Sequence, residues 1–384
     1  MVSFNFMLRS QRASTSSTQE SPQDGADPKS PIDKPLDVVF LQDTTGSQGP
    51  YIRSARKAIH NICDKISASG HLSTDLIRFG LIAFRDHPPQ DHTYVTKEFG
   101  FTSDINVMQK NLAGLIATGG GDGPEAQTAA LAAALNMEWA ENALKMVILI
   151  TDSPPHGIGE ARDGFSESPD QNDPLELARQ MAEKGITLFV IACEPRLSQY
   201  KNAVDFYTAL TQITSGKMFP LLMADKLGDY IVGTAIETME TEKLIGEFEQ
   251  VILDDVYTKA MPMEDVAQNL QAFMEQRGVK IKTMEVENVY NETETTRQNV
   301  AYWEGAKKVK HARRMVSPSK IQRMKAQFVG EDSRNHSHSF EAQGSTLSHA
   351  SRIVHSSVSR NSKVTPTGMV SNKTGTFTPH ASYK

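Results

Sequence analysis

Oxygen-bearing side chains stand at alternate positions directly after a short apolar segment of this 384-residue chain. Residues 38–41 form a continuous apolar run, which is typical of a buried strand in a parallel sheet. Asp43, Thr45 and Ser47 follow this run, and Gly46 allows a tight turn. One carboxylate and two hydroxyls at the end of a strand suit a hard divalent cation such as Mg²⁺. For this segment alone, the alternative is an ordinary helix-capping turn, in which Ser and Thr are common.

Two further loops supply carboxylates. The segment GGGDGPE carries Asp122 and Glu125, and the segment TDSPPHG carries Asp152 directly after an apolar strand. In α/β sheets, ligands bind outside the carboxyl ends of the strands. We therefore expect the three loops to meet at one edge of a sheet and to hold Mg²⁺, or alternatively Mn²⁺ or Ca²⁺. Because hydroxyl ligands are neutral, a cation held partly by hydroxyls keeps positive charge and can accept a carboxylate from a partner.

Apolar runs alternate with helical patterns along the first 235 residues. Strands are predicted near 38–41, 76–85, 94–99, 146–152, 186–193 and 217–222, and helices near 51–66, 105–116, 125–138, 173–185 and 200–214. The strand at 94–99 alternates in polarity and is predicted to be an antiparallel edge strand, and Pro220 places the last strand at an edge. This order predicts a three-layer α/β fold with a mainly parallel sheet and a helical C-terminal extension.

The composition changes along the chain and predicts five parts. Residues 1–34 are polar and aperiodic, which predicts a disordered N-terminal tail. The α/β domain is expected at 35–235 and an acid-rich helical extension at 236–304, within which the segment KIKTMEVENVY reads as either strand or helix. Residues 305–330 form a basic segment with eight Lys or Arg and no acid. The Ser-, Thr- and His-rich residues 331–384 are predicted to be disordered.

Charge and cysteine usage limit the class of protein. The net charge of −6 gives no general support for a nucleic-acid role. Only the basic segment 305–330 offers a site for nucleic acid, an anionic membrane or an import receptor; a solvated helix or linker is the alternative. Two cysteines, Cys63 and Cys193, form no disulfide framework, and no apolar run reaches the ~18 residues of a membrane span. We expect an intracellular, cytoplasmic protein, with a nuclear or mitochondrial location as the alternatives.

Other chemical motifs are weaker. The residues Asp86, His87, Asp91 and His92 have types that bind transition metals, but polar turn residues at the rim of the same face are the preferred interpretation. His156 is interpreted as a surface-loop histidine. A glycine pattern at 121–126 follows a predicted helix rather than a strand, which argues against a dinucleotide site. No Ser-His-Asp or Cys-His arrangement of a hydrolase is apparent in the sequence.

The three loops together resemble a known family. The segment DTTGS resembles the DxSxS motif of von Willebrand factor type A (VWA) domains, with Thr45 in place of the first serine, and Asp152 matches the third-loop aspartate of that family. The second loop, GDGPE, is similar to the integrin β-type domain, whose matching loop supplies a glutamate. With FRDHPP and TDSPPHG added, the combination is most similar to intracellular members such as the alpha-kinase-associated type. The resemblance covers residues 35–235.

The resemblance implies a metal-ion-dependent adhesion site (MIDAS) and a role for each residue. Thr45, Ser47 and Glu125 would bind the metal directly, and Asp43 and Asp152 would act mainly through water. Asp122 would bind a neighbouring cation. Three carboxylates around one Mg²⁺ also cancel its charge, so the resemblance leaves a structural role for the metal open beside an adhesive one.

These observations lead to one function hypothesis and two alternatives. The hypothesis is a metal-dependent protein-interaction module that captures an acidic side chain of a protein partner, without enzymatic activity and without a small-molecule substrate. In the first alternative the metal is purely structural and the helical extension recruits the partner. In the second, the metal and its bound water hydrolyse a phosphate ester, but no general base or leaving-group acid has been placed.

Overall fold

The structure, a computed structural model, describes residues 34–68, 76–318, 321–329, 336–364, 369–372 and 377–379. Six strands form one sheet in the order β3-β2-β1-β4-β5-β6. They are β1 (Leu36–Asp43), β2 (Ile77–Phe84), β3 (Thr96–Thr102), β4 (Leu144–Thr151), β5 (Ile186–Cys193) and β6 (Met218–Leu221). Every neighbouring pair is parallel except β2 and β3, which are antiparallel. The predicted sheet, with β3 and β6 at its edges, is therefore confirmed.

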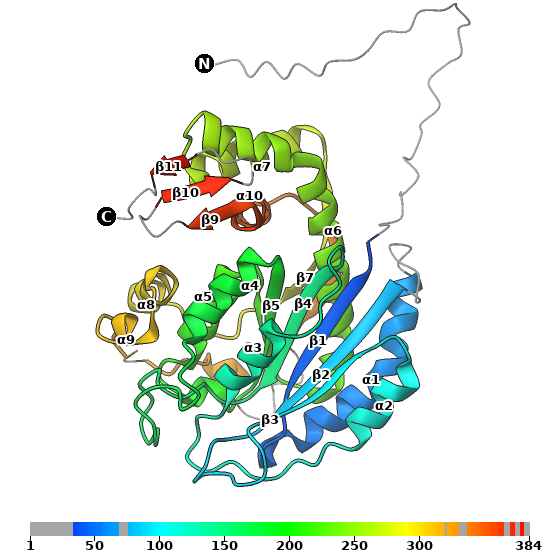
Figure 1. Cartoon of the computed structure of the whole chain (residues 1–384), viewed down its shortest axis with the longest axis vertical. Coiled ribbons are helices and arrows are strands. Elements are labelled where there is room, and N and C mark those ends of the chain that lie inside the picture. The colour runs from blue at the N-terminus through cyan, green and yellow to red at the C-terminus, as the bar shows by residue number, and fades with distance from the viewer. Residues whose placement is uncertain are drawn as a thin grey trace, which may run out of the picture. The chain divides into compact units, whose positions relative to one another are not determined.

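Helices cover both faces of this sheet (Figure 1). Its central strand β1 is buried along all eight residues, which explains the continuous apolar run in the sequence. One face packs against α1 (Gly49–Ala68), α2 (Ile105–Ala113) and α6 (Leu227–Leu253). The other face packs against α3 (Gln127–Leu135), α4 (Pro174–Glu183) and α5 (Ala203–Ile213). The fold is the predicted three-layer α/β arrangement.

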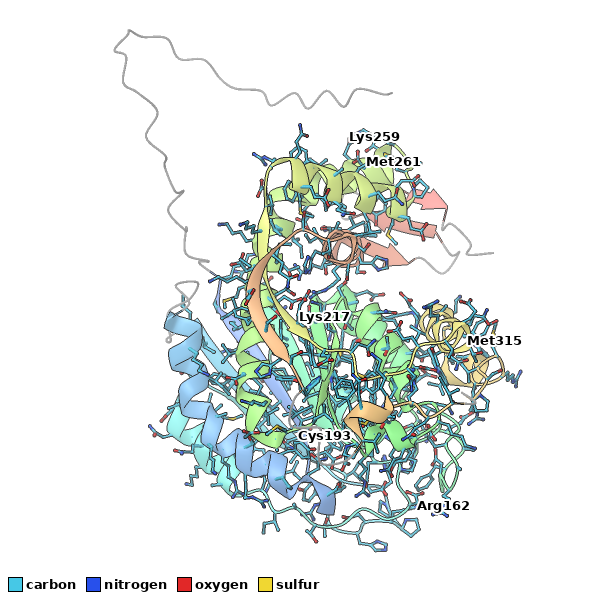
Figure 2. The ribbon with its side chains drawn as sticks, turned by 180° about the vertical axis from the view of Figure 1, so that it is seen from behind. Arg162, Cys193, Lys217, Lys259, Met261 and Met315 are labelled. Carbon is cyan, nitrogen blue, oxygen red and sulfur yellow. The ribbon has the colours of Figure 1, made fainter. Side chains whose placement is uncertain are left out.

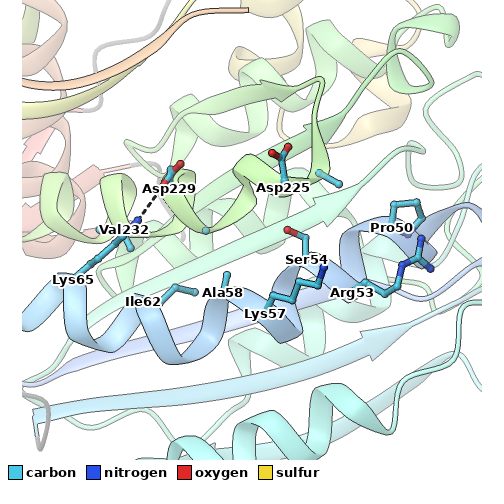
Figure 3. Close-up of a pocket in the computed structure, with 12 residues that line it drawn as sticks. Pro50, Arg53, Ser54, Lys57, Ala58, Ile62, Lys65, Asp225, Asp229 and Val232 are labelled. Atoms are coloured by element: carbon cyan, nitrogen blue, oxygen red, sulfur yellow. Dashed lines mark hydrogen bonds and ion pairs between the residues drawn. The ribbon is translucent and has the colours of Figure 1, made fainter. Parts of the chain in front are cut away.

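Helices α1 and α6 lie side by side along one face of the sheet (Figure 3). A Cβ atom on Gly228 would come within 2.8 Å of the Ala58 Cβ atom, so glycine permits this close approach. Lys65 and Asp229 form an ion pair of 2.9 Å across the two helices, and a pocket of about 330 Å³ lies beside them. Both ionic side chains are about half exposed, and such pairs contribute only about 0–1 kcal/mol to stability.

The chain continues beyond the sheet into a C-terminal extension. Its elements are η5 (Asp254–Thr258), α7 (Met263–Gln276), β7 (Lys280–Val286), α8 (Glu294–Gly305), α9 (Val309–Ala312), η6 (Ala326–Phe328), β8 (His338–Gly344), α10 (Leu347–Asn361), β9 (Ser362–Val364), β10 (Met369–Asn372) and β11 (Phe377–Pro379). A separate apolar core joins the second half of α6 to α7, β7 and α10. The undecided segment at 280–286 is a strand, and it pairs antiparallel with β8.

The prediction of disorder for residues 331–384 is wrong for residues 338–361. Ala350, Ile353 and Val354 of α10 are fully buried against α6 and α7, at the i, i+3, i+4 spacing of one helix face. The many Ser and His residues around them hide this short apolar stripe in the sequence. The other predicted tail, residues 1–34, lies outside the described residues except for its last residue. Residues 365–368, 373–376 and 380–384 also lie outside them.

A buried ionic cluster connects the extension to the sheet domain. Glu237 of α6 is fully buried and contacts both Lys217, at 2.7 Å, and Arg352 of α10. The second Glu237 oxygen accepts hydrogen bonds from the Thr283 hydroxyl and the Met284 amide of β7. Lys217, which lies directly before β6, also donates to the Thr283 hydroxyl (Figure 2). One carboxylate therefore links α6, the edge of the sheet, β7 and α10.

Most described cations of the basic segment 305–330 have partners within the chain. Arg323 forms a buried pair of 2.6 Å with Asp205, and Lys308 pairs with Glu176. Arg313 and Lys325 donate to backbone carbonyls. These side chains are used to fasten the segment to the domain, which leaves few of them for nucleic acid or an anionic membrane. Among the described residues, every helix is too short or too polar to cross a lipid bilayer.

Candidate metal centre

The first loop fixes Asp43 at the carboxyl end of β1. The Thr45 amide and hydroxyl donate to the Asp43 Oδ1 atom at 2.9 and 2.7 Å. The Thr151 hydroxyl, at the end of the neighbouring strand β4, donates to Asp43 Oδ2 at 2.8 Å. Asp43 is fully buried, so these bonds hold a carboxylate at the junction of two strands with little freedom to move.

The second loop packs directly on the first. The Gly46 amide donates to the Gly119 carbonyl, and the Thr118 amide donates to the Thr44 carbonyl. Gly120 has a φ of +86°, and a Cβ atom there would come within 2.6 Å of Glu125 Oε1 and 3.3 Å of the Thr45 Cβ atom. The Glu125 carboxylate and the Thr45 side chain therefore contact the same stretch of backbone. Only glycine fits this position without displacing one of them.

The third loop follows β4 and is joined to the second. The Glu125 amide donates to the Pro154 carbonyl at 3.0 Å, so Glu125 forms a bridge across to the segment after Asp152. The Gln127 side chain donates to the Thr151 and Ser153 hydroxyls, and the Tyr207 hydroxyl donates to the Ser153 carbonyl. Asp152 itself is buried beside them. The three predicted loops thus meet at the carboxyl edge of the sheet.

Among the described residues, Lys and Arg side chains do not balance the negative charge of the carboxylates at this edge. Burial and the charge of Asp152 raise the pKa of Asp43 to about 7. Burial and the charges of Asp43, Asp86, Asp152 and Asp122 raise the pKa of Glu125 to about 11. Glu125 Oε2 is buried without a hydrogen-bond partner among the described residues. The Arg196 guanidinium reaches Asp152 at 3.7 Å, but its side chain is 57% exposed and offsets little of this charge.

This geometry fits the divalent cation that the sequence implies. Asp43, Glu125 and Asp152 supply carboxylate oxygens and Thr45 supplies a hydroxyl, which is the oxygen-only set preferred by Mg²⁺ and Ca²⁺. The carboxyl groups of Asp43 and Glu125, whose pKa values are raised by burial and by neighbouring negative charges, are stabilised when a cation neutralises them. Ser47 lies in η1 (Gly46–Gln48) and is half-buried.

The family model of the von Willebrand factor type A domain matches residues 37–226. Residues 37–226 form a VWA domain. A putative ariadne-like RING finger protein of Acanthamoeba polyphaga mimivirus is 28% identical over 189 residues, covering 47% of this chain and 18% of that protein. The alpha-protein kinase vwkA of Dictyostelium discoideum is 30% identical over 122 residues, covering 32% of this chain and 19% of that protein. The chain therefore spans less than a fifth of the length of these relatives.

Two solved structures also resemble the chain. The von Willebrand factor type A protein from Catenulispora acidiphila aligns with a TM-score of 0.36 and 16% identity, over 54% of this chain and 43% of that one. The open conformation of the pilus adhesin SpaC from Lactobacillus rhamnosus GG aligns with a TM-score of 0.40 and 15% identity, over 54% of this chain and 30% of that one.

Asp122 of the VWA domain belongs to a second polar cluster beside the metal site. Its Oδ2 atom accepts hydrogen bonds from the Gly164 amide at 2.6 Å and from the Gln90 side chain at 3.3 Å. Asp86 and His156 lie in the same cluster, with ligand atoms of all three side chains within 4.8 Å of one another. Asp122 therefore makes its contacts in this second cluster, and its role as a ligand of a neighbouring cation stays a prediction.

The interpretation of His156 as a surface-loop histidine is wrong. It is 2% exposed, and its ring bonds to Asp86 on one side and to Asp163 on the other, each at 2.7 Å. Although burial disfavours the charged ring, these hydrogen bonds raise the pKa of His156 to about 9. Asp86, His87 and Asp91 are likewise buried rather than at the rim, whereas His92 is exposed. Because the loop after Asp152 has no periodic pattern, the sequence gives no signal for this pairing.

The C-terminal extension fastens the long third loop of the VWA domain. Arg313, from the basic segment, donates to the Gly157 carbonyl at 3.0 Å and to the Ser166 carbonyl at 2.6 Å. The Val309 amide donates to Asp173 at the far end of the same loop. The loop that carries His156 and Asp163 is thus held from outside by residues more than 130 positions away along the chain.

We expect Arg313→Ala to loosen this loop. Hydrogen bonds from a charged donor contribute about 1.5–3 kcal/mol, so local opening should become about ten- to a hundredfold more frequent. Hydrogen exchange of the Gly157 and Phe165 amides, which both donate to Asp163, would measure the change. Arg314→Ala is the control, because Arg314 is the exposed neighbour of Arg313. Equal protection in the two variants would contradict the fastening role of Arg313.

Proposed function

We propose that the VWA domain is a metal-dependent protein-interaction module, in which a divalent cation at the three loops captures an acidic side chain of a protein partner. The observation that supports this most is the buried Glu125 carboxylate near Asp43, Asp152 and Asp122. One of its oxygens has no hydrogen-bond partner in the part of the chain that the structure describes. A bound Mg²⁺ would neutralise these groups and offer a coordination position to an incoming carboxylate. VWA domains are commonly protein-interaction modules, which supports the same proposal.

The charge balance of the site bears on partner choice. Asp43, Glu125 and Asp152 together exceed the charge of one divalent cation, which weakens its attraction for an acidic partner. Arg196 offers an incoming carboxylate a second positive group, because its largely exposed guanidinium lies at this edge, 3.7 Å from Asp152. An acidic partner would therefore meet a metal and a guanidinium together. Arg196→Ala should weaken partner binding without removing the metal.

Calorimetric titration of the full chain tests the metal site. We expect Mg²⁺ and Mn²⁺ to bind at the three-loop site of the wild type and this binding to be lost in Asp43→Ala and in Glu125→Gln. Asp225→Asn is the control, since Asp225 is an exposed acidic residue of η4 (Ala224–Lys226) that is not among the predicted ligands. Folded wild type that binds no divalent cation, or that binds equally in all four proteins, would contradict the proposal.

Binding of displayed acidic peptides tests the interaction itself. We expect enrichment of Asp- or Glu-containing peptides in the presence of Mg²⁺, loss of binding with chelator, and loss in Asp43→Ala. Binding that survives both chelation and Asp43→Ala would favour the alternative in which the extension recruits the partner. Deleting residues 240–310 does not separate the two alternatives, because this segment carries β7 and α8, which pack on the domain.

We further propose that the protein acts inside the cell as a binding protein and not as an enzyme. Cys193 is a buried free thiol, as expected for a reducing compartment. Among the described residues at this edge of the sheet, we find no pair of side chains that would act as nucleophile and general base. A screen of phosphate esters with wild type and Asp43→Ala would reveal a metal-dependent hydrolase, and activity lost in the variant would overturn this part of the proposal.

A further inference from the structure

A second group of buried and half-buried side chains beside the three loops has the chemistry of a different cation site. We name Asp86, Asp122, His156 and Asp163 the histidine cluster. Asp86 Oδ1 lies 2.7 Å from His156 Nε2, while Asp86 Oδ2 is buried and has no hydrogen-bond partner among the described residues. Asp122 Oδ1 is also buried, and no other residue that the structure describes forms a hydrogen bond with it. Two acidic side chains therefore retain unused oxygens next to one imidazole nitrogen.

The far side of the imidazole is held in the way that metal-binding histidines are held. His156 Nδ1 lies 2.7 Å from Asp163 Oδ1, and Asp163 is itself fixed by the Gly157 and Phe165 amides. A histidine that binds a metal usually donates its other ring N–H to such a carboxylate, which fixes the tautomer and the direction of the free nitrogen. The Phe165 ring packs edge-on against His156 at 4.7 Å and holds the plane of the imidazole.

The remaining acidic side chain is also fixed in place. Asp122 Oδ2 accepts the Gly164 amide at 2.6 Å, which turns the unpartnered Oδ1 atom away from this backbone group. A Cβ atom on Gly164 would come within 2.7 Å of Asp122 Oδ2, so glycine is needed for this contact. Asp122 is only half-buried and Gly164 is exposed, which gives an ion a path to the buried atoms of Asp86 and His156.

We propose that Asp86, Asp122 and His156 form a binding site for a transition-metal ion of the Zn²⁺ class, oriented by Asp163. Zn²⁺ is bound by imidazole and carboxylate ligands, often with three protein ligands and one open position. Mg²⁺ and Ca²⁺ favour sites built from oxygen ligands alone, so the imidazole distinguishes this site from the three-loop site. The ion would replace the proton that otherwise lies between His156 and Asp86. This proposal does not depend on capture of an acidic partner.

Titration of Zn²⁺ into the full chain in excess Mg²⁺ tests the proposal, because Mg²⁺ occupies the oxygen-only site. We expect one Zn²⁺ per chain in the wild type and in Asp43→Ala. His156→Gln should weaken Zn²⁺ binding at least ~100-fold, and Asp122→Asn at least ~10-fold, since a ligand is lost in each. Co²⁺ in place of Zn²⁺ would add visible absorption bands that are sensitive to the imidazole ligand.

Two controls exclude nonspecific Zn²⁺ binding and unfolding as explanations of the result. His311→Gln removes an exposed histidine of α9 and should leave Zn²⁺ binding unchanged. Circular dichroism would show whether His156→Gln is folded, and Asp122→Asn, at a half-buried position, provides the test if it is not. Wild type that is folded but binds no Zn²⁺, or variants that bind it as tightly as wild type, would overturn the proposal. Loss of Mg²⁺ binding in Asp43→Ala with Zn²⁺ binding retained would separate the two sites.

Discussion

Asp43→Asn is expected to stabilise the metal-free protein at pH 8 by about 2–4 kcal/mol while abolishing its stabilisation by Mg²⁺. In the folded protein, burial and Asp152 raise the pKa of Asp43 to about 7, whereas its ordinary value is 3.8. At pH values between 3.8 and about 7, the folded state therefore binds more protons than the unfolded state. Its stability falls as the pH rises through this range, because a buried carboxylate must ionise. Asparagine keeps the acceptor for Thr45 and removes the charge.

Chemical denaturation at pH 4 and pH 8, with and without Mg²⁺, measures this effect. The gain from Asp43→Asn should be largest at pH 8 and small at pH 4, where the wild-type carboxyl is already protonated in the folded state. Mg²⁺ at about a hundred times its dissociation constant should stabilise the wild type by about 2.7 kcal/mol and leave the variant unchanged. Asp225→Asn, at an exposed position, should change neither value. A metal-free variant less stable than wild type at pH 8 would contradict this reading of the site.

Glu237→Ala is expected to destabilise the protein by about 3–5 kcal/mol, because it leaves Lys217 and Arg352 without their shared buried partner. Urea unfolding at pH 7 measures this loss. Glu247→Ala is the matched control, since Glu247 lies on the same helix and its pair with Arg277 is about half exposed. That variant should lose less than about 1 kcal/mol. Similar losses in the two variants would show that the buried cluster does not hold the extension.

The stabilisation that Glu237 provides is expected to be lost in acid. Although burial alone would raise it, Arg352 and Lys217 hold the pKa of Glu237 at about 2, below its ordinary value of 4.5. A lowered carboxyl pKa stabilises the folded state above the ordinary value, and this contribution is lost as the pH falls from 4.5 towards 2. The difference in stability between wild type and Glu237→Ala should therefore shrink over this range.

The sheet and the helices that cover it could be predicted because their signals are local. Each buried strand is a continuous apolar run, as in β1 and β4, and the strands alternate with helices that carry one apolar face. Strand β8 and helix α10 have no comparable local signal in the sequence. Strand β8 gains its stability by pairing with β7, about 55 residues earlier, and α10 buries a stripe of only a few apolar residues.

The residues of the candidate metal centre also differ in how far the sequence predicts their positions. The positions of Asp43, Thr45 and Asp152 follow from strand ends that must lie at one edge of a parallel sheet, which the sequence indicates. Glu125 lies instead in the loop between α2 and α3, so no strand end in the sequence places it. The histidine cluster instead depends on the path of the irregular loop after Asp152. Arg313 holds that path by donating to loop carbonyls, and the Val309 amide of α9 holds it by donating to Asp173. No periodic pattern in the loop predicts these contacts.

The buried cluster at Glu237 also bears on how the chain folds during synthesis. Glu237 leaves the ribosome 115 residues before Arg352, and Ser215, which accepts a hydrogen bond from Arg352, leaves it 137 residues before. At about 5–20 residues per second, the cluster waits roughly 6–23 seconds for its last member. During that interval the face of α6 that carries Leu244, Ile245 and Phe248 has no α10 to cover it. The nascent chain therefore presents an apolar helix surface suited to chaperone binding until α10 has been synthesised.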